Sequence, residues 1–172
     1  MTTVRALTED ELAVVARAYH DLYRRSSPDG EVGGTPWESL SDGDRSANRA
    51  SAEAVLGHAA DMGYDVVRTE GRVDPVAIPA DVVEVASLRE HDRWAEFKRA
   101  QGWVHGPARD PARRTHPDLV PWEELDESTR EKDRVRLRLI PELLARIGMA
   151  LVPRDGAHAG QSGGAAIRDG QH

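Results

Sequence analysis

The chain contains one sequence unit twice, with the copies 85 positions apart. Without any gap, 8 of 29 residues are identical between positions 36–64 and 121–149. Average residue usage would give about two identities by chance. The identical residues are Pro36, Trp37, Glu38, Leu40, Arg45, Arg49, Ala60 and Gly63 in the first copy, and Pro121, Trp122, Glu123, Leu125, Arg130, Arg134, Ala145 and Gly148 in the second. An internal duplication of this kind restricts the fold to two similar parts.

A histidine followed three positions later by an aromatic residue precedes each copy. The pairs are His20 with Tyr23 and His91 with Trp94. Because the pair persists in both halves, we interpret it as part of the core, with a satisfied imidazole. From histidine to proline there are 16 positions in the first half and 30 in the second, so the second half carries 14 additional residues.

Apolar periodicity and capping signals predict a mainly α fold: two pseudo-symmetric helix-loop-helix repeats packed together, with short extended segments and a disordered C-terminal tail. The predicted helices span about 9–25, 41–63, 80–100 and 126–148. Pro141 lies inside the last of these and should kink or divide it. Residues 64–78 alternate only in part, which indicates an extended linker with room for one short strand.

These patterns divide the chain into four parts. They are a degenerate repeat at 8–70, a linker at 71–79, a complete repeat at 80–150 and a flexible tail at 151–172. After Pro153 the tail contains five glycines, with Ile167 as its only sizeable apolar residue. Burial of so little apolar surface cannot offset the entropy of ordering the backbone.

Composition excludes several classes of protein. The 172 residues include no cysteine, which excludes disulfides and thiolate chemistry and suits the reducing cytoplasm, where we expect the protein. No apolar run approaches the roughly 18 residues that span a bilayer, so we expect no membrane partner. The net charge of −7 opposes tight binding to nucleic acid polymers. The oligomeric state stays open.

An ordered series of motifs runs through the second half. It consists of Leu88-Arg89-Glu90-His91-x-x-Trp94, Gly102-Trp103-x-His105-Gly106, His116-Pro117-Asp118-Leu119-Val120-Pro121-Trp122-x-x-Leu125, Lys132-Asp133-Arg134 and Ile140-Pro141-Glu142-Leu143-Leu144. Over about residues 82–150 the series closely resembles the ryanodine receptor repeat, or RyR domain, which also occurs in bacterial proteins unrelated to calcium channels. His105 stands where the family usually has tyrosine.

The resemblance implies a compact helical fold and, as in the channels, two repeats related by a pseudo-twofold axis. Some channel repeats are associated with adenine nucleotide binding, and bacterial RyR domains have been proposed as sensors of nucleotide-derived signals in defence systems. The first copy lacks counterparts of the Gly-Trp-x-x-Gly and His-Pro segments and looks like a degenerate, structural half.

The additional residues of the second half contain the candidate binding site. Trp103 lies in a predicted loop, where its indole can either stack on a nucleobase or pack beneath the loop as a local core. Guanidinium groups there can clamp a phosphate or remain solvated at the surface. The candidate ligand-binding residues are Trp103, His105, Arg109, Arg113, Arg114 and His116.

We therefore expect a non-catalytic sensor module that binds a nucleotide or a nucleotide-derived small molecule, for example a second messenger in bacterial defence or signalling. The alternative is an adaptor that docks on an effector protein. The sequence shows no nucleophile elbow, Walker loop or paired acid motif, so it predicts neither an enzyme nor a cofactor. His91, His105 and His116 lack the spacing of zinc ligands, so it also predicts no metal.

Overall fold

A computed structural model describes residues 2–26 and 35–154, so residues 27–34 and most of the predicted tail at 151–172 lie outside the described residues. The fold is mainly α. The helices are α1 (Glu9–Ser26), α2 (Asp42–Asp61), α3 (Ala80–Ala100), α4 (Glu127–Arg138) and α5 (Ile140–Ala145), with 3₁₀ turns η2 (Trp37–Ser39) and η3 (Trp122–Glu124). The strands are β1 (Tyr64–Arg68), β2 (Val104–His105), β3 (Thr115–His116) and β4 (Met149–Pro153).

Local signals in the sequence explain where these helices begin and end. The Ser41 hydroxyl accepts the Asp44 N–H at 3.1 Å and starts α2, and the Asp126 carboxylate accepts the Thr129 N–H at 2.7 Å and starts α4. A break separates α4 from α5 next to Pro141, as predicted, because proline cannot donate to the preceding turn. Among the described residues no helix is both long enough and apolar enough to cross a bilayer.

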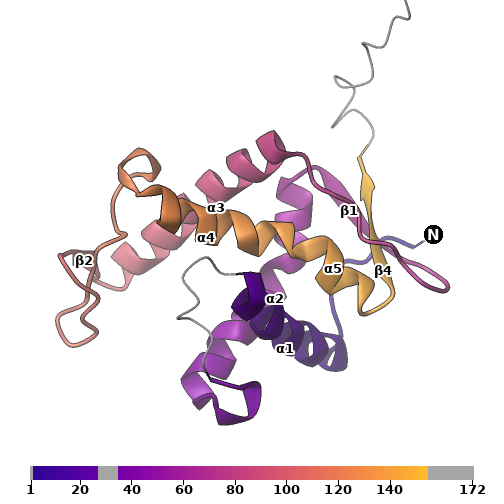
Figure 1. Cartoon of the computed structure of the whole chain (residues 1–172), viewed down its shortest axis with the longest axis horizontal. Helices are drawn as coiled ribbons and strands as arrows, with labels where there is room; N and C mark the ends of the chain where they lie inside the picture. The colour runs from indigo at the N-terminus through magenta and orange to yellow at the C-terminus, as the bar shows by residue number, and fades with distance from the viewer. Residues whose placement is uncertain (1, 27–34, 155–172) are drawn as a thin grey trace, which may run out of the picture.

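One core joins the two halves. In Figure 1, α3 and α4 run side by side above α1, and α2 rises from the lower edge toward β1, with the β1–β4 pair at one end and the β2–β3 loop at the other. The fully buried side chains come from both halves. They include Val15, Val55, Val83, Leu137, Ile140, Leu143, Leu144 and Met149. Burial of this shared surface stabilises either half more than it could be stabilised alone.

The last strand corrects the predicted start of the tail. β4 pairs antiparallel with β1, with Leu151 opposite Val66. Residues 151–153 therefore belong to a strand and not to the predicted tail at 151–172, and Leu151 is buried. The physical reason is the alternation of Met149 and Leu151, whose side chains enter the core while β1 satisfies the backbone.

The repeated histidines make the same contact in both halves. Nε2 of His20 lies 3.0 Å from the Thr35 carbonyl oxygen, and Nε2 of His91 lies 2.8 Å from that of Val120. Because a carbonyl oxygen only accepts, each Nε2 carries the proton and donates it. Thr35 and Val120 immediately precede the two Pro-Trp units. Each histidine therefore ties the first helix of its half to the following turn.

The repeated arginines also have matching roles. Nη2 of Arg45 donates to the Glu38 carbonyl at 3.0 Å, and Nη2 of Arg130 donates to the Glu123 carbonyl at 2.8 Å. In both halves the arginine of the second helix thus closes the 3₁₀ turn before it. The order of helix, 3₁₀ turn, helix and strand occurs in each half, and the second half adds β2 and β3 before its 3₁₀ turn and a break at Pro141.

We predict that replacing His91 with alanine lowers the free energy of unfolding by about 2–4 kcal/mol, because it leaves the Val120 carbonyl without its donor and opens a cavity beside Trp94 and Trp122. Chemical denaturation followed by circular dichroism measures this. Asp92→Ala is the control, since that side chain is exposed on the same helix and should change stability by less than about 0.5 kcal/mol. Equal losses in the two variants would contradict the assignment.

Candidate functional site

A series of five rings runs from the insertion into the second half of the core. Trp103 lies 6.4 Å from His116 between ring centroids, and His116 lies 5.0 Å from Trp94 in an edge-on arrangement. Trp94 is 5.7 Å from His91, which is 5.8 Å from Trp122. Such tilted and edge-on geometries are favourable for aromatic rings. The insertion is therefore packed on α3 through this ring series.

Backbone hydrogen bonds also hold the insertion. The Val104 N–H donates to the Arg114 carbonyl at 2.9 Å, which joins β2 to β3 in parallel register. Asp110 and Thr115 exchange two backbone hydrogen bonds of 3.0 Å and close the loop between the strands. Gly106 is required because a Cβ atom there would lie 2.7 Å from the Thr115 side chain. We call the segment 102–116 the β2–β3 loop.

Trp103 is half-buried, so it is neither a fully exposed stacking surface nor a fully buried core residue of the loop. Its ring lies 4.6 Å from Nζ of Lys98, a cation–π contact that covers part of one face. His105 is exposed, with Nδ1 3.1 Å from the Pro117 carbonyl oxygen. Both residues therefore help to hold the β2–β3 loop in place.

The three arginines of the predicted site have different neighbours. Nε of Arg113 lies 3.7 Å from the Asp110 carboxylate, and Nη1 of Arg114 donates to the Gln101 carbonyl at 3.1 Å. Arg114 has a φ of 54°, the left-handed region that side chains rarely adopt. Arg109 is exposed. None of the three lines the cavity that lies beside Trp94.

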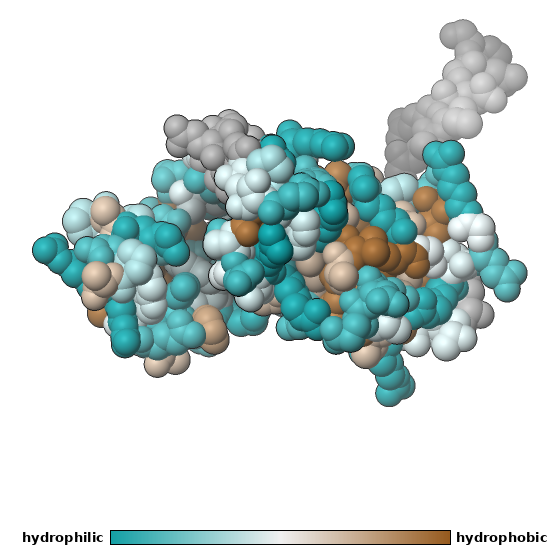
Figure 2. Space-filling model, turned by 90° about the horizontal axis from the view of Figure 1, so that it is seen from below, coloured by the Kyte–Doolittle hydropathy of each residue, from teal (hydrophilic) through white to brown (hydrophobic). Residues whose placement is uncertain are grey.

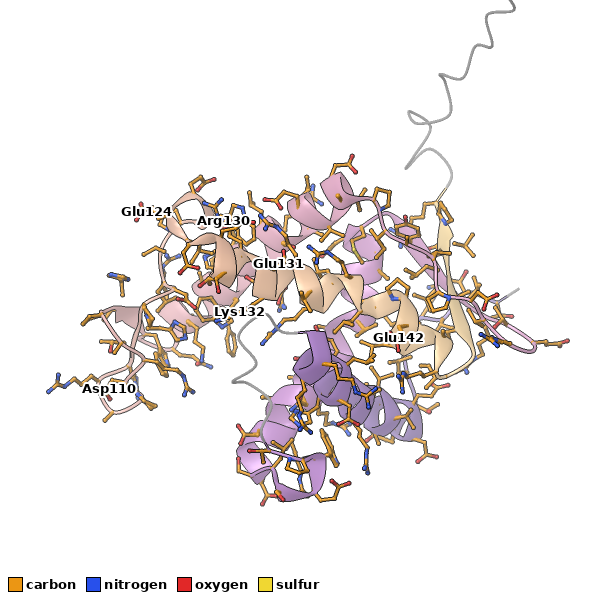
Figure 3. All side chains as sticks on the ribbon, viewed as in Figure 1. Asp110, Glu124, Arg130, Glu131, Lys132 and Glu142 are labelled. Carbon is orange, nitrogen blue, oxygen red and sulfur yellow. The ribbon has the colours of Figure 1, made fainter. Side chains whose placement is uncertain are left out.

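That cavity, of about 210 Å³, lies between α3, β3 and α4; we call it the second-half cavity. Its lining residues are Glu90, His91, Trp94, His116, Asp118, Thr129, Lys132, Asp133 and Arg136. Of the residues predicted to bind a ligand, only His116 is among them. Figure 3 shows Lys132 on α4, well away from Asp110 at the tip of the β2–β3 loop.

The second-half cavity combines charged groups of both signs with a neutral ring. Burial lowers the pKa of His116, and the Asp118 N–H donates to its Nδ1 at 3.1 Å, so the proton of the neutral ring is on Nε2. Burial raises the pKa of Asp133. With Lys132 and Arg136 on the same helix, the cavity can bind an anion, a flat ring and hydrogen-bond donors.

An adjoining cavity of about 370 Å³ lies between the two halves. It shares Glu90, Trp94, Asp133 and Arg136 with the second-half cavity. Its other lining residues include Ala50 and Ala54 of α2 and Phe97 of α3, which add apolar surface, and His58, whose pKa is lowered by burial. Trp94 therefore stands between a charged compartment and a more apolar one.

The corresponding cavity in the first half, of about 390 Å³, has a different lining. It contains His20, Asp44, Ala47, Asn48 and Ser51, where the second half has His91, Thr129, Lys132, Asp133 and Arg136. The Asn48 amide donates to the Asp44 carbonyl at 2.9 Å, and the Ser51 hydroxyl donates to the Ala47 carbonyl at 3.2 Å. These polar groups serve their own helix, and α2 contributes no cation to the cavity, whose lining cation is Arg136 of α4.

Sequence reasoning missed Lys132 and Arg136 because single charges on a helix are usually surface residues. Their spacing of four positions puts both on one face of α4. A comparison of the two halves would have revealed them, since Ala47 and Ser51 occupy the same positions of the first copy.

Comparison with known families agrees with the resemblance seen in the sequence. Residues 77–153 match the family model described as the RyR domain. The matched segment runs from just before α3 to the end of β4 and includes every residue that lines the second-half cavity. The chain therefore contains an RyR domain, at residues 77–153.

Proposed function

We propose that this protein is a non-catalytic module of the cytoplasm that binds a nucleotide or nucleotide-derived small molecule in the second-half cavity. The observation that carries the proposal is the pairing of the rings of Trp94 and His116 with the cations of Lys132 and Arg136 in one cavity. The equivalent positions of α2 carry no charged side chain at 47, 48 or 51.

Each part of a nucleotide has a matching group. The rings of Trp94 and His116 offer apolar faces to a base, and stacking contributes about 1–3 kcal/mol per base in proteins that bind single strands. Lys132 and Arg136 match the charge of a phosphate. The carboxylates of Glu90 and Asp133 accept hydrogen bonds from ribose hydroxyls or an amino group.

The size of the site supports the same ligand class. The second-half cavity has about 210 Å³ and the adjoining cavity about 370 Å³. Ligand sites usually have about 300–1,000 Å³. With the base at Trp94, one ligand can extend from the charged compartment toward the apolar side chains of Ala54 and Phe97.

In this proposal the predicted residues of the β2–β3 loop mainly support the cavity. Trp103 packs next to His116 and keeps that ring at the cavity wall. Burial is the main cause of the lowered pKa of His116, and Asp118 raises that pKa in part. Arg109 lowers it further, so the positive charge of Arg109 lies near the same wall. His105 holds the loop at Pro117.

We further propose that the two halves are RyR-like repeats related by a pseudo-twofold axis through the β1–β4 pair. Tyr64 pairs with Pro153, and Arg68 pairs with Met149. Tyr64 corresponds to Met149 and Arg68 to Pro153 in the duplication, so exchanging the two halves converts each pair into the other. A twofold axis between Val66 and Leu151 has this effect on an antiparallel register. The first half then acts as the structural partner of the ligand-binding half.

Calorimetry with ATP, ADP, NAD and cyclic nucleotides tests the proposed function. We expect binding to at least one of them, and a loss of at least about tenfold in affinity for Trp94→Ala and for the double variant K132Q/R136Q. R138Q/R146Q is the matched control, because it removes the same charge from residues that do not line the cavity. It should bind within about twofold of the wild type.

Two results would overturn the proposal. One is the absence of binding across the whole panel by protein whose circular dichroism shows the native helix content. The other is an equal loss in K132Q/R136Q and R138Q/R146Q, which would assign the effect to overall charge and not to the cavity.

A further inference from the structure

The β2–β3 loop and the adjoining end of α3 form a positive end on an acidic protein. Residues 98–116 contain five basic residues against Asp110, a net charge of 5 − 1 = +4. With −7 for the whole chain, the remainder carries −7 − 4 = −11. The basic residues are Lys98, Arg99, Arg109, Arg113 and Arg114. We call this set the basic end.

Elsewhere in the described chain, many arginines have a carboxylate partner. Examples are Arg17 with Glu38, Arg49 with Glu9, Arg68 with Glu11, Arg134 with Glu84, Arg138 with Glu131 and Arg154 with Asp65. Within residues 98–116 the one carboxylate is Asp110, and its Oδ1 accepts the N–H groups of Ala112 and Arg113. Within the described residues, Arg99 and Arg109 form no ion pair.

The loop holds these cations on a fixed frame. The backbone hydrogen bonds between β2 and β3, and the exchange between Asp110 and Thr115, restrain both sides of the loop. The Arg113 side chain is 84% exposed. Figure 1 shows the loop projecting beyond the end of α3, and in Figure 2 this end, at the left, is mostly hydrophilic. Because the backbone of the loop is already restrained, it loses little entropy when the loop binds a partner.

The position of the cations separates them from the proposed ligand. Arg99, Arg109 and Arg113 do not line the second-half cavity or the adjoining cavity. Exposed Val104, with 57% of its surface accessible, lies on the same loop and offers an apolar contact. The combination of exposed guanidiniums and an apolar side chain is typical of a protein-binding surface.

We propose that the basic end docks a short acidic peptide segment of a partner protein. Aspartate and glutamate side chains match guanidinium groups in charge and in fork geometry. A long polyanion such as RNA, or an anionic membrane, would also approach the rest of the chain, whose net charge is −11. Electrostatic repulsion therefore disfavours both partners. A short segment contacts the loop alone.

Fluorescence anisotropy with a labelled peptide of aspartate and glutamate residues, at low ionic strength, tests the proposal. A peptide of the same length made of asparagine and glutamine is the neutral control. We expect R99Q/R113Q to bind the acidic peptide at least about tenfold more weakly than the wild type. R72Q/R146Q removes the same charge at exposed arginines outside the basic end and should change affinity by less than about twofold.

Several outcomes would overturn the proposal: no binding of the acidic peptide, equal binding of the neutral peptide, or equal weakening in the two double variants. Tighter binding of an oligonucleotide or of phosphatidylserine vesicles through the same arginines would assign the surface to another partner class. Nucleotide calorimetry on R99Q/R113Q separates this proposal from the proposed function, because neither residue lines the cavities and the affinity for the nucleotide should stay within about twofold. Circular dichroism confirms that each variant is folded.

Discussion

The hydrogen bond from a buried histidine to the carbonyl before a Pro-Trp unit is the contact on which the rest of the structure depends. Each half contains it, from His20 to Thr35 and from His91 to Val120. It fixes the 3₁₀ turn against the first helix of the half and so sets where the second helix begins. Because the imidazole is buried, loss of the bond would leave a polar group without a partner, which costs about 1–3 kcal/mol.

In the second half the same histidine has additional contacts, because the ring of His91 also packs against Trp94 and Trp122. Trp94 in turn contacts His116 at the base of the β2–β3 loop. The charged cavity opens beside this ring series. Duplication therefore provides one half that keeps the packing contacts and another that adds to them a loop and the two cations of α4.

Much of the fold could be predicted from the sequence because its signals are local. The caps at Ser41 and Asp126 and the break at Pro141 are set by neighbouring residues. β4 was missed because its partner, β1, lies far away in the sequence and both strands have only five residues. A pairing of that kind leaves a weak periodic signal.

The candidate site could be predicted only in part. His116 was recognised and does line the cavity, whereas Arg113 and Arg114 have closer partners in Asp110 and the Gln101 carbonyl. Sequence distance alone cannot show with which of several nearby groups a guanidinium will form a hydrogen bond or an ion pair. The roles of Lys132 and Arg136 became visible once α4 was packed beside Trp94.

The most direct test of the account is ¹⁹F NMR of protein labelled with fluorotryptophan, since the chain has 4 tryptophans and they lie in different environments. During a titration with ATP, or with whichever nucleotide of the panel binds most tightly, we expect the resonance of Trp94 to move and that of Trp37 in the first half to stay in place. Movement of Trp37 instead of Trp94, or equal movement of both, would contradict the claim that the second half alone holds the ligand.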